Sequence, residues 1–283
     1  MIEVSCYNCG STHHTLYATE NGCSLVKCAG CGLLYVNPRP SDQEIDESVK
    51  VGAHKGEQTL NSTGHYMATK VAIYRKVLID IYGMELQGRK RTWLDIGCGH
   101  GELLVALQKL CKGNVAAKGI EPNRHKIAAA RKRGLDVGYF DLASHDERYD
   151  SISLLNVYSH LTNPPEFFRL VRQRLRPKGE VLLETGDTAS LPVDKHPRPF
   201  DLPYELSFAS EQILLRMLKQ CGFEIISVNK YPAIKLRFMK GIIVKDIVKR
   251  VLLRKTSKLP ALYTQLRAAK YRTDMWIRAR AAV

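Results

Sequence analysis

The stretch Leu94-Asp-Ile-Gly-Cys-Gly-His-Gly101 decides the fold that we expect for this chain. Residues 91–96 read as a buried strand, and residues 102–110 repeat leucine at the spacing of a helix. Glycines between a strand and a helix allow a ligand to approach the backbone closely. The carboxylate of Asp95 at the strand end would repel a pyrophosphate but attract an ammonium or a sulfonium. The stretch therefore predicts a nucleotide-type cofactor loop.

Strands and helices alternate on the carboxyl side of this loop. The next strand delivers Glu121, 20 residues after Gly101, where an acidic side chain accepts hydrogen bonds from ribose hydroxyls, and Pro122 ends that strand. Further segments follow, with strands at 116–120, 135–139, 149–155 and 180–184 and helices at 124–133, 165–175 and 210–220. The alternation predicts an α/β fold with a doubly wound parallel sheet.

Two Cys-x-x-Cys pairs, Cys6/Cys9 and Cys28/Cys31, precede the cofactor loop. Glycines follow both pairs, so the backbone can curl with its amides toward sulfur, and four thiolates satisfy tetrahedral zinc. The spacing between the pairs is that of a zinc ribbon. A site closed by four cysteines is structural, so we expect Zn²⁺ to stabilise a small module and to take no part in chemistry.

Length and composition suit one large domain with a small accessory module, because 283 residues that are 45% hydrophobic can bury a full core. No basic, apolar leader and no long uncharged apolar run is found, so we expect a cytoplasmic protein. Residues 230–283 carry 15 Lys and Arg against two Asp, whereas the rest carries 28 basic and 26 acidic groups. The basic surface is therefore local.

Six elements in order resemble class I S-adenosylmethionine-dependent methyltransferases, particularly small-molecule and sugar methyltransferases with an N-terminal zinc ribbon. The elements are Cys28-Ala-Gly-Cys-Gly-Leu-Leu-Tyr-Val-Asn-Pro-Arg-Pro40, Leu94-Asp-Ile-Gly-Cys-Gly-His-Gly101, Gly119-Ile-Glu-Pro-Asn123, Tyr149-Asp-Ser-Ile-Ser-Leu-Leu-Asn156, His160-Leu-Thr-Asn-Pro164 and Leu175-Arg-Pro-Lys-Gly179. The resemblance implies a seven-stranded Rossmann-like sheet, completed by strands at 223–229 and 274–280 with the final strand antiparallel. It divides the chain into a zinc-ribbon module (1–40), a helical linker or lid (41–90) and a methyltransferase domain (91–283).

The resemblance also implies site residues. Asp95, Gly97, Cys98, Gly99 and Gly101 would cradle the methionine part of S-adenosylmethionine, and Glu121 with Pro122 the ribose. Asp141 and Leu142 would contact the adenine, and Asn156 would line the pocket near the methyl group.

An acceptor with a poorly acidic hydroxyl would need a general base, for which His160 is the best candidate. It can equally be a helix-start residue that packs against the lid. The loop after the strand at 180–185 is expected to cover the substrate, and its polar residues are Glu184, Asp187, Asp194, His196, Tyr204 and Glu205. Glu184, Tyr204 and Glu205 could position an acceptor. Related enzymes often place a histidine near Pro203-Tyr-Glu-Leu-Ser-Phe208, where this chain has none.

The segment at about 233–270 reads as a basic insertion. Within it, residues 240–254 repeat apolar residues every four positions beside Lys245, Lys249 and Arg250. Such a helix can cover a core, lie on an anionic membrane surface or meet another anionic partner. A lipid-linked acceptor and a place at the inner membrane face follow from the second interpretation.

Three functions are therefore weighed. The first is methylation, at oxygen, of a small hydroxylated acceptor such as a sugar or glycoconjugate. The second is an RNA base methyltransferase, although Asn156-Val-Tyr-Ser159 stands where an Asn-Pro-Pro-Tyr-type tetrapeptide would be, and no aromatic and basic platform is seen. These two features argue against nucleic acid as a partner. The third is a non-catalytic zinc-ribbon adaptor.

Overall fold

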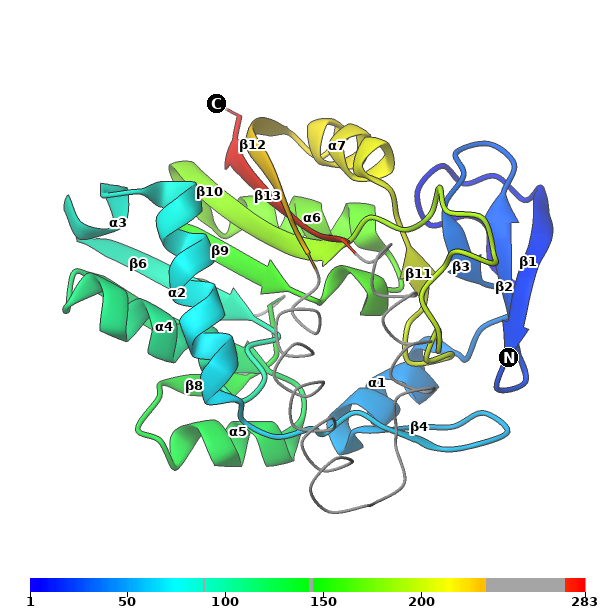
Figure 1. Ribbon diagram of the computed structural model, residues 1–283, viewed down its shortest axis with the longest axis horizontal. Helices are drawn as coiled ribbons and strands as arrows, with labels where there is room; N and C mark the ends of the chain where they lie inside the picture. The colour runs from blue at the N-terminus through cyan, green and yellow to red at the C-terminus, as the bar shows by residue number, and fades with distance from the viewer. Residues whose placement is uncertain (89, 143–144, 233–272, 283) are drawn as a thin grey trace, which may run out of the picture.

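The computed structural model describes residues 1–88, 90–142, 145–232 and 273–282, and a seven-stranded sheet forms its centre (Figure 1). The sheet runs in the order β12-β13-β10-β9-β6-β7-β8, and β13 is antiparallel to both of its neighbours while the others are parallel. The strands are β6 (Arg91–Ile96), β7 (Val115–Glu121), β8 (Val137–Tyr139), β9 (Tyr149–Leu155), β10 (Leu175–Gly186), β12 (Phe223–Pro232) and β13 (Thr273–Ala281). The predicted doubly wound methyltransferase-type sheet is confirmed.

Helices cover both faces of the sheet, because successive strand side chains point to opposite sides. In β10, Leu182 packs with Trp93 and Trp276 beneath α2 and α4, whereas Val181 and Leu183 face α6 and α7. The helices around the sheet are α2 (Ala68–Tyr82), α3 (Glu85–Gly88), α4 (Glu102–Cys111), α5 (Arg124–Arg131), α6 (Pro164–Gln173) and α7 (Glu211–Gln220).

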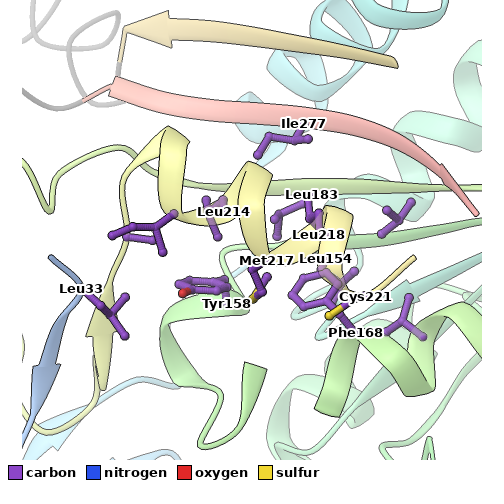
Figure 2. Close-up of a cluster of buried hydrophobic side chains, with 14 of the residues drawn as sticks. Leu33, Leu154, Tyr158, Phe168, Leu183, Leu214, Met217, Leu218, Cys221 and Ile277 are labelled. Carbon is purple, nitrogen blue, oxygen red and sulfur yellow. The ribbon is translucent and has the colours of Figure 1, made fainter. Parts of the chain in front are cut away.

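The core on the α6 and α7 side extends into the N-terminal module (Figure 2). Leu214 and Met217 of α7 pack with Phe168 of α6 over the sheet, and Tyr158 lies between them and Leu33 of the module. Tyr158 and Leu33 are both fully buried. Because one apolar cluster spans both parts, the module is packed into the main core of the protein.

The N-terminal module is a four-stranded sheet in the order β1-β2-β3-β11. Its first three strands, β1 (His14–Glu20), β2 (Cys23–Cys28) and β3 (Leu34–Val36), fall within the predicted module of residues 1–40. The fourth, β11 (Ser207–Phe208), comes from the loop that follows β10 and pairs antiparallel with β3. The loop that was predicted to cover the substrate thus adds a strand to the sheet that carries the cysteine knuckles.

The predicted linker or lid at 41–90 contains more than helices. It begins with α1 (Asp42–Val51), continues through a hairpin of β4 (Ala53–His54) and β5 (Leu60–Asn61), and ends with α2 and α3. The hairpin brings His54 toward the loop that carries Tyr204, because the two rings lie 4.6 Å apart between centroids. The hairpin therefore packs against the loop that was predicted to cover the substrate.

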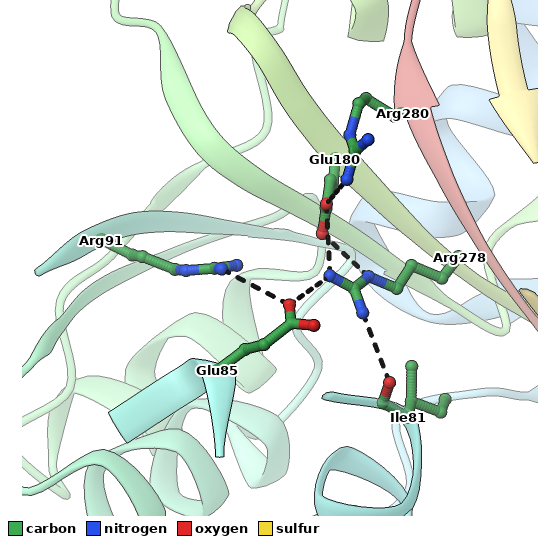
Figure 3. Close-up of polar contacts among 6 residues, drawn as sticks. All are labelled: Ile81, Glu85, Arg91, Glu180, Arg278 and Arg280. Atoms are coloured by element: carbon green, nitrogen blue, oxygen red, sulfur yellow. Dashed lines mark hydrogen bonds and ion pairs between the residues drawn. The ribbon is translucent and has the colours of Figure 1, made fainter. Parts of the chain in front are cut away.

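A buried ion network ties the amino-terminal ends of the parallel strands to α2 and α3 (Figure 3). The Arg278 guanidinium donates to both carboxylate oxygens of Glu180 and also pairs with Glu85. Arg280 donates to Glu180 from the side, and Arg91 lies 3.8 Å from Glu85. The network lies at the edge of the sheet opposite the glycine turn, so it serves the fold.

The basic segment at 233–270, including the amphipathic stretch at 240–254, lies outside the described residues. Among the helices of the described part, none combines the length and the apolar character that a bilayer crossing requires.

Candidate active site

The site lies where the strand order reverses. From β6 the chain passes to β7 and β8 on one side, and it then returns to place β9 on the other side of β6. In open α/β sheets this switch leaves a crevice outside the carboxyl ends of the two central strands. The glycine turn after β6 and Asn156 after β9 both fall there.

The glycine turn is held by a carboxylate from the neighbouring strand. Glu121, at the end of β7, accepts hydrogen bonds from the Gly99 amide at 2.9 Å and from the Asn123 amide at 3.0 Å, one on each oxygen. A carboxylate has about four acceptor positions, so two remain for hydroxyl donors. Gly99 has a φ of +55° and nothing within 4 Å of an added Cβ, so this face of the turn is open to a ligand. The structure places Glu121 against the glycine turn, and its contact with ribose stays a prediction.

Asp95 is buried at the end of β6 and accepts a hydrogen bond from Ser153 at 2.6 Å. Ser153 in turn accepts from the Trp93 indole at 2.8 Å, which fixes its hydroxyl toward Asp95. Burial raises the pKa of Asp95 to about 7, with further increases from the charges of Glu121 and Glu102 and a decrease from the Ser153 hydrogen bond. Among the residues that the structure describes, Asp95 is therefore a buried carboxylate with no ion-pair partner.

Tyr74 of α2 was not predicted as a site residue. Burial raises the pKa of its hydroxyl, and so do the charges of Glu184, Glu102, Asp95 and Asp274. The carboxylates converge on Tyr74 from β6, α4, β10 and β13, so four acidic side chains of the described residues meet at this end of the sheet. The sequence alone could not predict this cluster of acidic residues, since its members are far apart in the chain and come together only in the fold.

The other predicted cofactor residues lie around the same edge. Gly97 and Gly101 both have positive φ, and Gly101 begins α4. Pro122 is half-buried after β7, Asn156 is exposed, and Leu142 is buried while Asp141 beside it is exposed. The Cys98 thiol packs inward, because a Cβ on Gly119 would lie 2.6 Å from its sulfur. Cys98 therefore contributes its backbone, and not its thiol, to the face of the turn that is open to a ligand.

His160, Tyr204 and His54 form a stack beside this edge. The His160 and Tyr204 rings lie 4.2 Å apart at an interplanar angle of 29°, and His54 packs on Tyr204. His160 Nδ1 lies 3.0 Å from the Tyr204 carbonyl, which accepts only if Nδ1 carries the proton. Nε2 then holds the lone pair, and it is buried without a hydrogen-bond partner among the described residues. Glu205 lies 3.8 Å from Nδ1.

His54 is the member of this stack that sequence reasoning missed. It is 4% exposed, and burial lowers its pKa to about 4, with smaller contributions from His160 and Lys126. Burial likewise raises the pKa of Tyr204, and the charges of Glu205 and Glu121 raise it further. Because the Glu121 charge acts on the Tyr204 hydroxyl, the stack lies near Glu121.

The polar loop predicted to cover the substrate is divided by the structure. The prediction that Glu184 belongs to this loop is wrong, because it lies buried within β10 between Leu155 and Trp276. Asp187 accepts from the Glu211 amide at the start of α7. His196 packs among the rings of Tyr17, Phe200 and Phe208, and Asp194 is an exposed partner of Lys195. Of the loop residues, Tyr204 and Glu205 reach His160.

The four predicted metal ligands come together. The sulfur atoms of Cys6, Cys9, Cys28 and Cys31 all lie within 4.8 Å of one another, and Cys6–Cys31 and Cys9–Cys28 are 3.5 Å apart. A tetrahedron of 2.3 Å zinc–sulfur bonds has edges of about 3.8 Å. The hydrogen bond from Cys6 lowers the pKa of Cys31 to about 5. Donor type, number and spacing fit Zn²⁺.

Comparisons with known proteins agree with this geometry. A family model described as a methyltransferase domain matches residues 65–228. A tRNA U34 carboxymethyltransferase of Azotobacter vinelandii is 29% identical over 149 residues, 47% of this chain and 46% of that protein. A ubiquinone biosynthesis O-methyltransferase of Caulobacter vibrioides is 33% identical over 101 residues, 33% of this chain and 40% of that protein. The chain thus matches less than half the length of each of these relatives.

Among solved structures, the geranyl diphosphate C-methyltransferase of Streptomyces coelicolor, in complex with S-adenosyl-L-homocysteine, has a TM-score of 0.56 at 12% identity. The match covers 75% of this chain and 79% of that one, and at this identity it shows the fold. The family model covers more than half of the chain, and the sheet order and glycine turn agree with it. The chain belongs to the methyltransferase-domain family of class I S-adenosylmethionine-dependent enzymes.

Proposed function

We propose that this protein transfers a methyl group from S-adenosylmethionine to oxygen of a small hydroxylated acceptor, a sugar or a glycoconjugate. The observation that supports it most is the set of buried carboxylates around an open glycine turn, at the switch point of a methyltransferase sheet. A cofactor with an ammonium and a sulfonium would neutralise these charges. The sugar acceptor rests on the resemblance of the sequence alone.

In this proposal different residues of the chain bind different parts of the cofactor. Asp95 faces the ammonium, the free acceptor positions of Glu121 take the ribose hydroxyls, and Asp141 with Leu142 borders the adenine. Asn156 lies near the methyl group. S-adenosylmethionine, when bound, supplies an electrophilic methyl on sulfur. The protein contributes orientation and exclusion of water.

His160 is the proposed general base. The Tyr204 carbonyl accepts from Nδ1–H, so Nε2 can take the proton of the acceptor hydroxyl. S-adenosylmethionine, held by Asp95 and Glu121, would supply its methyl group to the acceptor oxygen and leave as the neutral thioether while Nε2 of His160 takes the hydroxyl proton. Tyr204 and Glu205 position the acceptor and the imidazole, and His54 packs behind Tyr204.

Labelled methyl transfer tests this proposal. Purified protein with methyl-labelled S-adenosylmethionine is offered nucleotide sugars, bulk tRNA and lipid-linked sugars in parallel. Label in a sugar fraction that requires His160 supports the proposal. Label found in tRNA alone, or no binding of S-adenosyl-L-homocysteine in calorimetry, would reject it. Absence of binding would favour the interpretation of the protein as a non-catalytic zinc-ribbon adaptor.

An RNA acceptor is the second candidate, and one observation favours it: the relative from Azotobacter vinelandii is named as a tRNA U34 carboxymethyltransferase. Retention on immobilised tRNA should then weaken steeply between low and moderate salt, because phosphate contacts release counterions. A flat response would remove the candidate.

The basic composition of residues 233–270 supports a further proposal, contact with an anionic or lipid-linked acceptor surface. Flotation with anionic liposomes compares wild type with a variant that has glutamate at positions 245, 249 and 250. Equal recovery of the two proteins would end this proposal.

A further inference from the structure

The tip of the β1–β2 hairpin in the N-terminal module reaches both walls of the acceptor site. Asn21 and Gly22 form a two-residue turn, with φ values of 52° and 74°, between the paired residues Glu20 and Cys23. Positive φ at both positions is the geometry that an Asn-Gly hairpin turn adopts. The turn presents the side chains of Glu20 and Asn21 toward the rest of the protein.

Glu20 binds the backbone of the substrate loop. Its carboxylate accepts from three successive amides, those of Phe200 at 3.0 Å, Asp201 at 2.7 Å and Leu202 at 3.4 Å. The chain continues from this clamp to Tyr204 and Glu205. Three donors converging on one carboxylate hold a loop whose own residues form no strand until β11.

Asn21 joins the β4–β5 hairpin, which carries His54, to the loop that carries Tyr204. Its side-chain amide donates to the Leu202 and Gln58 carbonyls at 2.9 Å each, and its Oδ1 accepts from the Gln58 amide at 2.5 Å. Gln58 lies in the β4–β5 hairpin that carries His54. A Cβ on Gly56 would lie 2.4 Å from the Asn21 side chain, so glycine permits this close approach.

The cysteine knuckles lie at the end of β2 that is farther from the hairpin tip. β2 runs from Cys23 beside the tip to the metal ligand Cys28, and β3 follows Cys31 (Figure 1). The Val36 amide donates to Leu206, and the Leu206 amide donates to Ser159, next to His160. The module therefore contacts the acceptor residues both at its tip and along β3.

We propose that Glu20 and Asn21 are positioning residues of the acceptor site, which hold Tyr204 between His54 and His160. The inference rests on the proposed acceptor site but not on the identity of the acceptor. It assigns the zinc module a part in methyl transfer, as the frame that sets the acceptor walls while the cofactor site forms without it.

Amide hydrogen exchange in the full-length, zinc-loaded protein tests this proposal. In Glu20→Gln the carboxamide nitrogen would face an amide donor, so exchange in the peptide spanning 198–206 should rise about tenfold to 100-fold. Exchange at 91–101 and the affinity for S-adenosyl-L-homocysteine should stay within about twofold of wild type, since neither depends on the clamp. Glu20→Asp should restore part of the protection, and Glu47→Gln, the same change at an exposed site, should have no effect.

A second measurement reports on the stack itself. In wild type, NMR should show His54 titrating near pH 4, and in Glu20→Gln its pKa should rise as Tyr204 moves away. Unchanged exchange at 198–206 with an unchanged His54 titration would overturn the proposal. So would an equal increase in exchange throughout residues 1–40, because Glu20 would then stabilise only its module. Failure of wild type to bind S-adenosyl-L-homocysteine would instead reject the proposed function.

Discussion

Replacing Asp95 with asparagine should stabilise the free protein and weaken cofactor binding at the same time. Asn cannot ionise, yet its carbonyl oxygen can still accept the hydrogen bond from Ser153. The substitution therefore removes the buried charge while it keeps the shape and the hydrogen bond. Most substitutions in a buried site destabilise, so an increase in stability is a distinctive expectation.

The magnitude follows from the raised pKa. Folding shifts the pKa of Asp95 from its usual 3.8 to about 7, so the ionised group destabilises the folded state by about 4 kcal/mol at pH 8. This penalty is absent below the pKa that Asp95 has in the unfolded chain. It grows between about pH 4 and pH 7 and is constant above the pKa that Asp95 has in the folded protein. We expect Asp95→Asn to gain up to about 4 kcal/mol at pH 8 but only about 2 kcal/mol at pH 5.

Two assays on the same variant check these expectations. Urea unfolding at pH 5 and pH 8 gives the stability difference, and calorimetry with S-adenosyl-L-homocysteine gives the affinity, which should fall about tenfold to 100-fold as a charge-assisted hydrogen bond is lost. Asp80→Asn, on the exposed face of α2 beside Lys76, is the matched control. A destabilised Asp95→Asn protein at pH 8, or undiminished affinity, would refute the assignment of Asp95 to the ammonium.

Four further outcomes are expected. The affinity of wild type for S-adenosyl-L-homocysteine should rise about tenfold from pH 6 to pH 8, because Asp95 is mostly protonated at pH 6, and a flat calorimetric profile would contradict this. His160→Gln should lower methyl transfer about 10²- to 10⁴-fold in a labelled-methyl assay while cofactor affinity is kept, and retained turnover would dismiss it as the base. Metal analysis should find one zinc per chain, and Cys28→Ser should lower both the zinc content and the melting temperature; full zinc content in the variant would argue against this ligand. Glu180→Gln should cost about 3 kcal/mol in urea unfolding, since Arg278 and Arg280 lose their shared carboxylate, and a neutral effect would show that the network adds little.

The central sheet could be predicted because local patterns determine it. The strand predicted at 91–96 matches β6, and the leucine spacing after Gly101 matches α4, which ends one residue later than predicted. The strand predicted at 180–184 extends to Leu175–Gly186 in β10, through an irregularity between Leu175 and Glu180. Glu184 ends the predicted strand and was also counted with the polar loop, but β10 continues for two further residues to Gly186, because the end of a strand carries little local signal.

The acceptor side could be predicted only in part. His160, Tyr204 and Glu205 were named from the sequence, and they lie together. His54 and Glu20 were missed, because their roles depend on contacts with a loop about 150 to 180 residues later in the chain. A two-residue strand such as β11 likewise has too few residues to show a periodic pattern.

A crystal structure with S-adenosyl-L-homocysteine tests the central claim most directly, that the cofactor lies across the ends of β6 and β7. We predict its ammonium within hydrogen-bonding distance of Asp95 and its ribose hydroxyls on Glu121, with the adenine toward Leu142. Cofactor density at another place on the chain, or a ribose that does not touch Glu121, would contradict the account.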